Sequence, residues 1–176
     1  MNDPTGAITV CPYNPAAHDA SALWALKRNF ELGLGSETGG DEKGETYAAK
    51  LTDEYRERWL HWVHRCVDED PDCVVVAETT DPTESKPPLV GYAFLLPESL
   101  AFIWDAAVLN EIYVRQEQRG TGVADDLLEA ALACARLQDL PLDRIALDVD
   151  PTNPRAKAFY DRYGFERWGE MVARGL

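Results

Sequence analysis

The chain has 176 residues, of which 45% are hydrophobic and 27% charged, and these values are typical of one globular domain. This composition excludes collagen, a coiled coil and wholesale disorder. With 31 Asp and Glu against 17 Lys and Arg, the formal net charge is −14. Such a surface repels duplex nucleic acid and anionic membranes, so we expect neither to be a partner.

The chain also lacks the sequence signals of export or membrane insertion. It contains no apolar run long enough to cross a bilayer, and residues 1–10 lack a basic region followed by an apolar stretch. A cytoplasmic protein is therefore expected. The cysteines show neither a C-x-x-C pair nor zinc-type spacing, so we predict no metal site and interpret them as small core residues: Cys11, Cys66, Cys73 and Cys134.

The acidic residues are spread along the whole chain, and two hypotheses explain them. One is adaptation to concentrated salt, in which carboxylates keep the protein hydrated. It predicts that the melting temperature rises between low and molar KCl. The other hypothesis is attraction of a cationic substrate. The even spread of the acids favours salt adaptation.

The N-terminal part of the chain predicts mainly helices. Ala7 to Val10 predicts a short strand, and His18 to Phe30 a helix with its apolar residues on one side. Gly33 to Glu45 is rich in glycine and acids, which predicts a flexible loop. Tyr47 to Val67 follows helical spacing until Asp70–Pro71 ends it. The aromatic residues of the two helices are expected to pack between them: Trp24, Tyr55, Trp59 and Trp62.

The C-terminal part alternates strands and helices. Short β-branched and apolar runs predict the strands, and the first two should form a hairpin. The last helix is marked by Asn153 as N-cap, Pro154 in the first turn and Gly164 after the end. The predicted strands are Cys73–Thr79, Leu89–Leu96, Val108–Val114, Arg144–Val149 and Phe165–Val172, and the predicted helices are Gly122–Leu137 and Asn153–Gly164. This order predicts one α/β domain with a mixed sheet.

The most informative stretch is Gln118 to Ala124, which leaves a strand and opens a helix. Its two glycines allow a tight turn, and the first N–H groups of the helix have no partners within it. Together with the helix dipole, these groups suit a pyrophosphate. The stretch is neither the dinucleotide fingerprint G-x-G-x-x-G nor a P-loop. The alternative is a plain strand-to-helix turn, which acids in the first turn, Asp125 and Asp126, would stabilise anyway.

Three motifs in this part of the chain resemble one family. Arg119-Gly-Thr-Gly-Val-Ala124 resembles the R-x-x-G-x-G/A signature of the GNAT superfamily of N-acetyltransferases. It follows Asn110-Glu-Ile-Tyr-Val114, which is similar to the fourth strand of that family. Further on, Asn153 and the run Ala158-Phe-Tyr-Asp-Arg-Tyr-Gly-Phe165 resemble its final helix and strand. The three motifs occur in the family's order and in the expected elements.

The resemblance covers Cys73 to Val172, whereas residues 1–72 match in outline, as the helical pair that shapes the acceptor site. It implies an α/β (α+β) fold in a single domain over residues 1–176. The sheet is expected to be mixed and mostly antiparallel, with about six to seven strands flanked by about four helices. Homodimers are frequent in the family, so the resemblance also allows a homodimer.

The resemblance further implies that acetyl-CoA lies in a cleft where the fourth and fifth strands separate. The backbone of Ile112, Tyr113 and Val114 would pair with the pantetheine arm, and an N–H near Ile112 would stabilise the oxyanion. The loop N–H groups would hold the pyrophosphate. The expected cofactor-binding residues are Ile112, Tyr113, Val114, Arg119, Gly120, Thr121, Gly122, Val123, Ala124, Asn153 and Phe159.

Two residues are candidates for proton transfer. Glu111 is the candidate general base, on a strand face expected to include Leu109 and Tyr113, where a carboxylate needs a partner. The alternative is a glutamate that faces water or is hydrogen-bonded structurally. Tyr160 aligns with the family's Tyr and is the candidate general acid toward the CoA sulfur. The alternative is a core position, since Tyr160 lies at helical spacing from Phe159 and Tyr163.

These observations predict a cytoplasmic N-acetyltransferase that uses acetyl-CoA as cosubstrate and needs no metal. The acetyl group would pass directly, in a ternary complex, to a primary amine of a small molecule or a protein. Gly33–Glu45 is the candidate lid over the acceptor. One alternative is a non-catalytic acyl-CoA-binding or sensing module. A second is a nucleotide-phosphate binder or hydrolase, although the lysine of a P-loop is missing.

Overall fold

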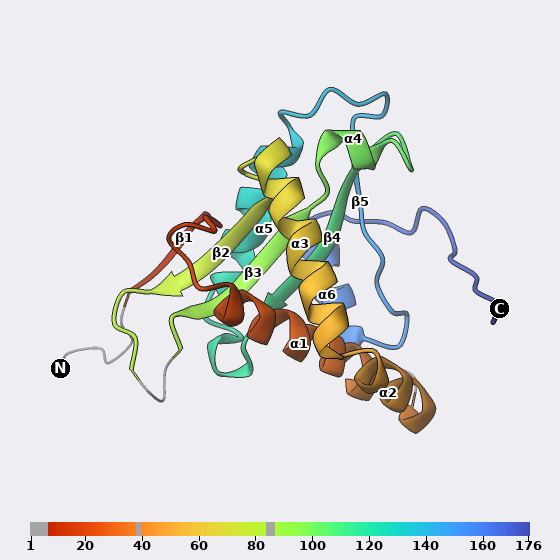
Figure 1. Ribbon diagram of the computed structural model, residues 1–176. Coiled ribbons are helices and arrows are strands. Elements are labelled where there is room, and N and C mark those ends of the chain that lie inside the picture. Colours follow the sequence, from red (N-terminus) through yellow and green to blue (C-terminus); the bar gives the residue numbers. More distant parts are fainter. Residues whose placement is uncertain (1–6, 38–39, 84–86) are drawn as a thin grey trace.

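The computed structural model describes residues 7–37, 40–83 and 87–176. One mixed sheet runs through it in the order β1-β2-β3-β4-β5 (Figure 1). The first four strands pair antiparallel, and the fifth is parallel to the fourth. The strands are β1 (Ile8–Pro12), β2 (Val74–Thr79), β3 (Leu89–Leu95), β4 (Ala107–Val114) and β5 (Ile145–Ala146). The predicted mixed, mostly antiparallel sheet and its hairpin are confirmed, with five described strands instead of six or seven.

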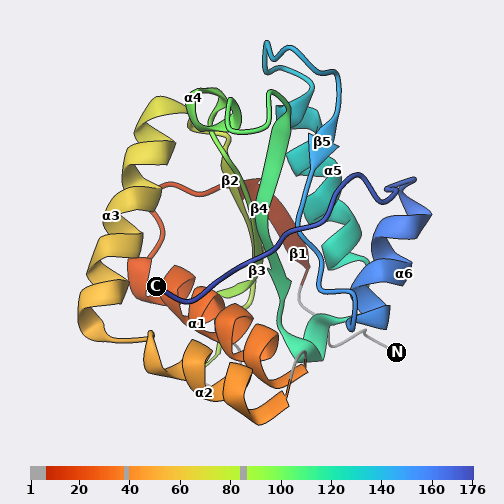
Figure 2. The ribbon, with the colours of Figure 1, turned by 90° about the vertical axis from the view of Figure 1, so that its right-hand side faces the viewer.

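Helices cover both faces of the sheet. Figure 2 shows α1 and α3 on one face and α5 and α6 on the other. The helices are α1 (Ala20–Glu37), α2 (Gly40–Ala49), α3 (Asp53–Glu69), α4 (Glu98–Ala101), α5 (Val123–Ala135) and α6 (Pro154–Arg162). The described residues thus form six helices, more than the four predicted. None of these helices is long and apolar enough to cross a membrane.

Alternation along the strands builds a separate core on each face. On the α1 and α3 side, Val74, Val76, Tyr92 and Phe94 pack against Leu23, Leu26, Trp59 and Val63. The aromatic packing predicted between the helices is confirmed, with the Trp24 and Trp59 rings 6.0 Å apart. On the α5 side, Val75, Ala77, Val90 and Ala93 pack against Leu127, Leu128 and Ala131.

The predicted loop Gly33–Glu45 is largely helical. α1 continues to Glu37 and α2 begins at Gly40, while residues 38 and 39 lie outside the described residues. Asp41 and Glu42 stabilise the first turn of α2, and packing of α2 against α1 outweighs the low helix propensity of the glycines. The predicted helix Tyr47–Val67 is in turn interrupted at residues 50–52. Thr52 caps the second segment by accepting a hydrogen bond from the Tyr55 N–H at 3.1 Å.

The C-terminal prediction is correct for the helix and wrong for the last strand. Asn153 caps α6 by accepting a hydrogen bond from the Ala156 N–H at 3.0 Å, as expected. Residues Phe165–Val172 form no strand, and β5 is shorter than the predicted Arg144–Val149. Met171 and Val172 are 64% and 86% exposed, so no apolar burial favours their pairing with a neighbouring strand.

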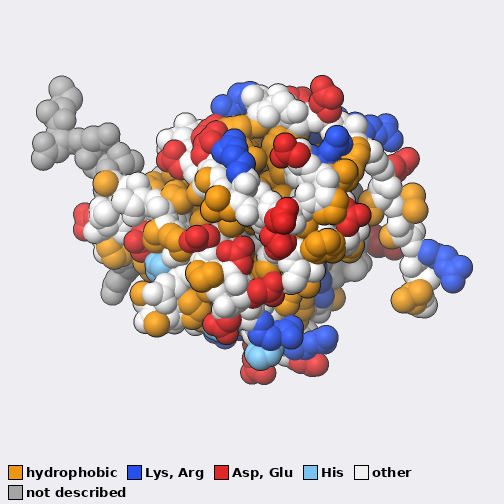
Figure 3. Space-filling model, turned by 90° about the horizontal axis from the view of Figure 1, so that it is seen from above, with side chains coloured by type: hydrophobic (Ala, Val, Ile, Leu, Met, Phe, Trp, Pro, Cys, Tyr) orange, Lys and Arg blue, Asp and Glu red, His pale blue; other side chains and the backbone are white. Residues whose placement is uncertain are grey.

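The acidic residues are scattered over the face of the molecule that is seen from above. In the view from above, their side chains lie between hydrophobic and uncharged ones instead of gathering in one patch (Figure 3). This agrees with their spread along the sequence.

Candidate active site

An irregularity in β4 decides which side chains face which helices. Phe94 of β3 pairs with Glu111, but Leu95 pairs with Leu109, so Asn110 is an extra, bulged residue. Leu109 accordingly packs in the core on the α5 side, whereas Glu111 points to the α1 side. The prediction that Leu109 shares a face with Glu111 and Tyr113 is therefore wrong, because the bulge shifts the alternation by one residue.

β4 and β5 are joined over two residue pairs only. Ala107 pairs with Ile145 and Val108 with Ala146, after which β5 ends while β4 continues to Val114. In Figure 2 the chain after β5 runs away from β4 toward α6. Beyond Val108, no described strand pairs with the β5-facing edge of β4. That edge carries Ile112 and Val114, and its backbone groups can accept an extended ligand as an added strand.

The loop after β4 has positive backbone φ angles at its two glycines. Gly122 is the N-cap of α5 with φ 94°, and Gly120 has φ 79°, a region that L side chains rarely adopt. No side chain caps the first turn of α5, so its N–H groups have no side-chain partner there. Asp125 is turned toward α6, where its Oδ1 accepts hydrogen bonds from Arg162 at 2.9 Å and Tyr163 at 2.8 Å.

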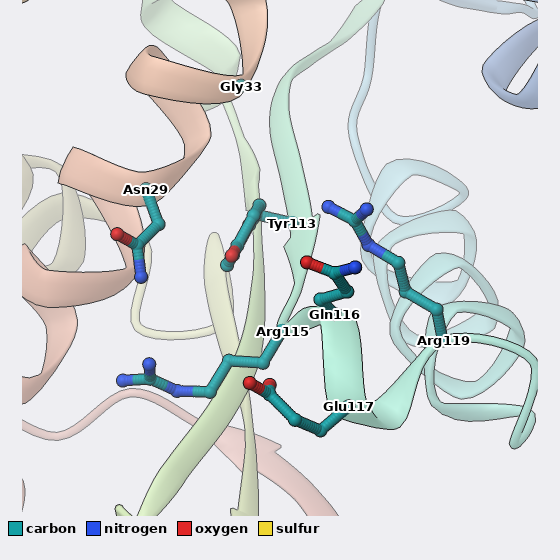
Figure 4. A pocket seen from close by; sticks show the side chains of 7 residues that line it. All are labelled: Asn29, Gly33, Tyr113, Arg115, Gln116, Glu117 and Arg119. Atoms are coloured by element: carbon teal, nitrogen blue, oxygen red, sulfur yellow. The ribbon is translucent and has the colours of Figure 1, made fainter. Parts of the chain in front are cut away.

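A polar cavity of about 280 Å³ lies beside this loop. Figure 4 shows Asn29 on α1 and Arg119 on opposite sides of Tyr113. The Arg119 Nε–H donates to the Val114 carbonyl at 3.3 Å, and its guanidinium lies 6.0 Å from the Tyr113 ring. The lining residues are Asn29, Gly33, Tyr113, Arg115, Gln116, Glu117 and Arg119. The cavity therefore lies between the end of β4 and α1, and two arginine side chains line it.

Glu111 belongs to a buried network of charged side chains. Glu111 is 6% exposed, and Lys27 and Glu31 of α1 are each 3% exposed. The Lys27 ammonium forms ion pairs with Glu111 and, at 2.5 Å, with Glu31. The Tyr92 hydroxyl donates to the other oxygen of Glu111 at 2.6 Å. Both oxygens of Glu111 thus accept hydrogen bonds from the protein.

The network stays charged in spite of its burial. Burial alone would lower the pKa of Lys27, but the Glu111 and Glu31 carboxylates raise it overall. Burial alone would raise the pKa of Glu31, but Lys27 and then Lys50 hold it below its usual value. Burial, followed by the Glu111 carboxylate, raises the pKa of Tyr92 well above its usual value. Opposite charges therefore compensate one another inside the protein.

Tyr160 lies in the other core. Its ring contacts those of Phe159 and Phe165, with centroids 5.4 and 5.5 Å away. Burial raises the pKa of Tyr160 to about 12, so its hydroxyl is protonated at neutral pH. That hydroxyl makes no hydrogen bond to another described residue. Tyr160 and Glu111 belong to clusters on opposite faces of the sheet and do not contact each other.

A further cluster of polar groups lies outside the predicted site. The ligand atoms of Cys11, His18 and Glu78 are within 4.8 Å of one another, so Cys11 is not simply a core residue. His18 Nδ1 accepts a hydrogen bond from the Asn14 N–H at 2.9 Å, so Nε2 carries the proton of the neutral ring. Nε2 lies 3.4 Å from Glu78. The tautomer favours a hydrogen-bonded cluster over a metal site.

Sequence reasoning did not identify the partners of Glu111. Lys27 and Glu31 are four residues apart on the helix face that also carries Leu23. A charged pair at that spacing within an apolar stripe is the signal that could have found them, because buried charges require partners. Glu111, the third charged residue of the network, is distant in sequence from this pair.

Comparison with known proteins adds independent information on this fold. Residues 39–165 match the model of the acetyltransferase (GNAT) family. A segment of 65 residues, 37% of this chain, is 41% identical to a 5-NmdU N-acetyltransferase of Pseudomonas phage PaMx11. The match spans 43% of that relative, less than half of its length.

Solved structures of similar fold cover nearly the whole chain. An AAC(6')-Iy structure with a bisubstrate analog superimposes with a TM-score of 0.66 at 14% identity, over 97% of this chain and 98% of the other. The PaiA N-acetyltransferase of Thermoplasma acidophilum, in complex with coenzyme A, gives 0.65 at 18% identity, over 91% and 90%. These structural likenesses show the fold, and the family model covers more than half of the sequence. The chain therefore belongs to the acetyltransferase (GNAT) family.

Proposed function

We propose that this protein transfers an acetyl group from acetyl-CoA directly to a primary amine of a small molecule or a protein. The observation that carries the proposal is the adjacency of two features at the end of β4. One is the β4 edge that no described strand covers, and the other is the α5 N-terminus behind Gly122. The first suits an extended pantetheine arm and the second a pyrophosphate. The phage relative, whose name states an N-acetyltransferase, supports an amine acceptor.

In this proposal the cofactor is held mainly by backbone groups. Ile112, Tyr113 and Val114 pair with the pantetheine arm, and the N–H groups of residues 119–124 bind the pyrophosphate. Phe159 adds an apolar contact from α6. Asn153 contributes less, because its side-chain oxygen already caps α6. The Arg119 guanidinium is close enough to this loop to neutralise a phosphate oxygen.

The amine attacks the thioester carbonyl as a neutral nucleophile, so its ammonium must first lose a proton. Glu111 is the proposed base. Because both its oxygens accept hydrogen bonds and it is 6% exposed, a water at the Asn110 bulge is favoured as the carrier of that proton. The carbon–sulfur bond then breaks, and Tyr160 gives its proton to the departing thiolate. The proton released by the amine restores Tyr160 through solvent.

The test combines calorimetric titration of acetyl-CoA with measurement of CoA release over a panel of primary amines. We expect micromolar binding, no response to ATP with magnesium, and turnover with part of the panel. Glu111→Gln should lower kcat about a hundredfold, and Tyr160→Phe should lower kcat without changing the Kd of acetyl-CoA. Absence of acetyl-CoA binding at any salt concentration would refute the proposal.

One observation favours a second candidate, a non-catalytic acyl-CoA-binding module. The full engagement of Glu111 by Lys27 and Tyr92 is what a structural glutamate would show. Such a module would bind acetyl-CoA with the same affinity but release no CoA with any amine. The turnover measurement therefore separates the two functions.

A further inference from the structure

A second ammonium group lies at the outer edge of the buried network, in a cage that is open to solvent. It belongs to Lys50, in the turn between α2 and α3. Its Nζ is 2.7 Å from Oε2 of Glu31, 4.4 Å from the centre of the Tyr47 ring and 5.6 Å from that of Tyr55. The Lys50 side chain is 40% exposed, whereas that of Glu31 is 4% exposed. The cage thus has a buried anionic floor and an accessible mouth.

The cage has the chemistry that recognises an alkylammonium group. A carboxylate supplies opposite charge, and two aromatic faces attract a cation through their quadrupoles. Oε2 of Glu31 forms an ion pair with the Lys50 ammonium at 2.7 Å. An ammonium that displaced Lys50 would therefore meet the same buried carboxylate oxygen between the two tyrosine rings.

The two lysines of the network differ in how easily another cation can displace their ammonium groups from the carboxylates. Lys27 is enclosed by two carboxylates and by the rings of Phe30 and Trp59, at 5.3 and 5.4 Å. Lys50 is 40% exposed and lies outside a helix. Ion pairs with an exposed partner contribute little to stability, so displacing the Lys50 ammonium has a small cost. Removing Lys27 would instead leave Glu111 buried without a cation and Glu31 with Lys50 alone.

The cage lies on the same side of the sheet as the proposed base. Glu31 shares the Lys27 ammonium with Glu111, so one side chain links the cage to β4. We infer that Glu31, Tyr47 and Tyr55 form a subsite for a second, non-reacting ammonium of the acceptor, with Lys50 as its internal occupant in the free protein. The acceptor class is then a primary diamine. This inference deepens the proposed transfer to amines and rests on it. The net charge of −14 also attracts such a dication.

The test compares two acceptors that differ by one ammonium, butylamine and diaminobutane. Wild type should show a higher kcat/KM for diaminobutane. Lys50→Ala removes a tethered competitor whose effective concentration is on the order of millimolar, so kcat/KM for diaminobutane should rise about tenfold. The value for butylamine should change less than twofold. Lys157→Ala, which removes an exposed lysine of α6, is the matched control and should alter neither value.

A second pair of variants tests the aromatic wall in the Lys50→Ala background. Tyr47→Ala should lower kcat/KM for diaminobutane about fivefold, and Tyr47→Phe, which keeps the ring, should restore it. A general folding defect would instead lower the values for both amines.

Calorimetric titration of diaminobutane into Lys50→Ala separates the subsite from the transfer reaction. Binding that Tyr47→Ala weakens, without turnover of either amine, would support the subsite and refute the proposed function. Turnover with equal kcat/KM for both amines, unchanged by Lys50→Ala, would refute the subsite and leave the transfer reaction intact.

Discussion

The two walls of the candidate site are built in different ways. On the proposed cofactor wall, residues 115–124 form one short local stretch whose backbone conformation depends on Gly120 and Gly122. On the proposed acceptor wall, Lys27 of α1 and Glu111 of β4 are 84 residues apart in sequence and meet only in the folded protein. One wall thus depends on local backbone geometry, and the other on long-range pairing of buried charges.

This difference has a physical consequence for ligand binding. The cofactor wall leaves N–H groups of a helix terminus without side-chain partners, so it is ready for an anion. The acceptor wall already contains two ammonium groups, those of Lys27 and Lys50, facing two carboxylates. We therefore expect substitutions on the acceptor wall to act first on stability, and those on the cofactor wall to act first on loop conformation and binding.

The largest effect is expected from Lys27→Met. It leaves Glu31 and Glu111 buried without their shared cation, which should lower the free energy of unfolding by about 3–5 kcal/mol. Urea unfolding followed by tryptophan fluorescence measures this loss, because Trp59 adjoins Lys27. The exposed Lys157→Met is the control.

A triple substitution sharpens that experiment. In Lys27→Met, Glu31→Gln, Glu111→Gln no buried charge is left unpaired, so much of the lost stability should return. If Lys27→Met alone lowered the free energy of unfolding by less than about 1 kcal/mol, the charged network would not be what stabilises the acceptor wall.

A smaller effect is expected from Gly122→Ala on the cofactor wall. A Cβ at Gly122 meets no atom within 4 Å, so the penalty comes only from its φ of 94°. Left-handed backbone costs about 1–2 kcal/mol for an L residue, and the loop should partly relax and bind acetyl-CoA more weakly. Urea unfolding and calorimetric titration measure the two effects. Gly169→Ala, also without a clash, is the matched control, and equal behaviour of the two variants would contradict the assigned role of the backbone.

The smallest effect is a difference in pH dependence. Because the folded-state pKa of Glu31 is lowered, the unfolded chain binds more protons in acid, and the stability due to Glu31 is lost as pH falls below about 4.3. Glu31→Gln should therefore lose less stability than wild type between pH 5 and acid conditions. Unfolding at a series of pH values measures the slopes. Glu57→Gln, on an exposed position of α3, should keep the wild-type slope.

Predictions from sequence were most accurate where the interactions are local. The cap at Asn153, the strand-to-helix loop and the β2–β3 hairpin each depend on residues within one short stretch. The prediction of a loop at Gly33–Glu45 was wrong because packing of α2 against α1 stabilises both helices. The glycine content of the stretch does not reveal this tertiary contact. Phe165–Val172 was predicted as a last strand, yet Met171 and Val172 are mostly exposed and pack against no other described element.

The sequence by itself determined the family motifs, the order of most elements and the glycine backbone of the cofactor loop, since these follow from neighbouring residues. Only the tertiary structure decided the acceptor wall. The bulge at Asn110 reverses the alternation of β4, so Glu111 meets Lys27 under α1 instead of sharing a face with Leu109. The pairing of Lys27, Glu31 and Glu111 follows from burial, because charges removed from water are stable only against opposite charges that the fold brings to them.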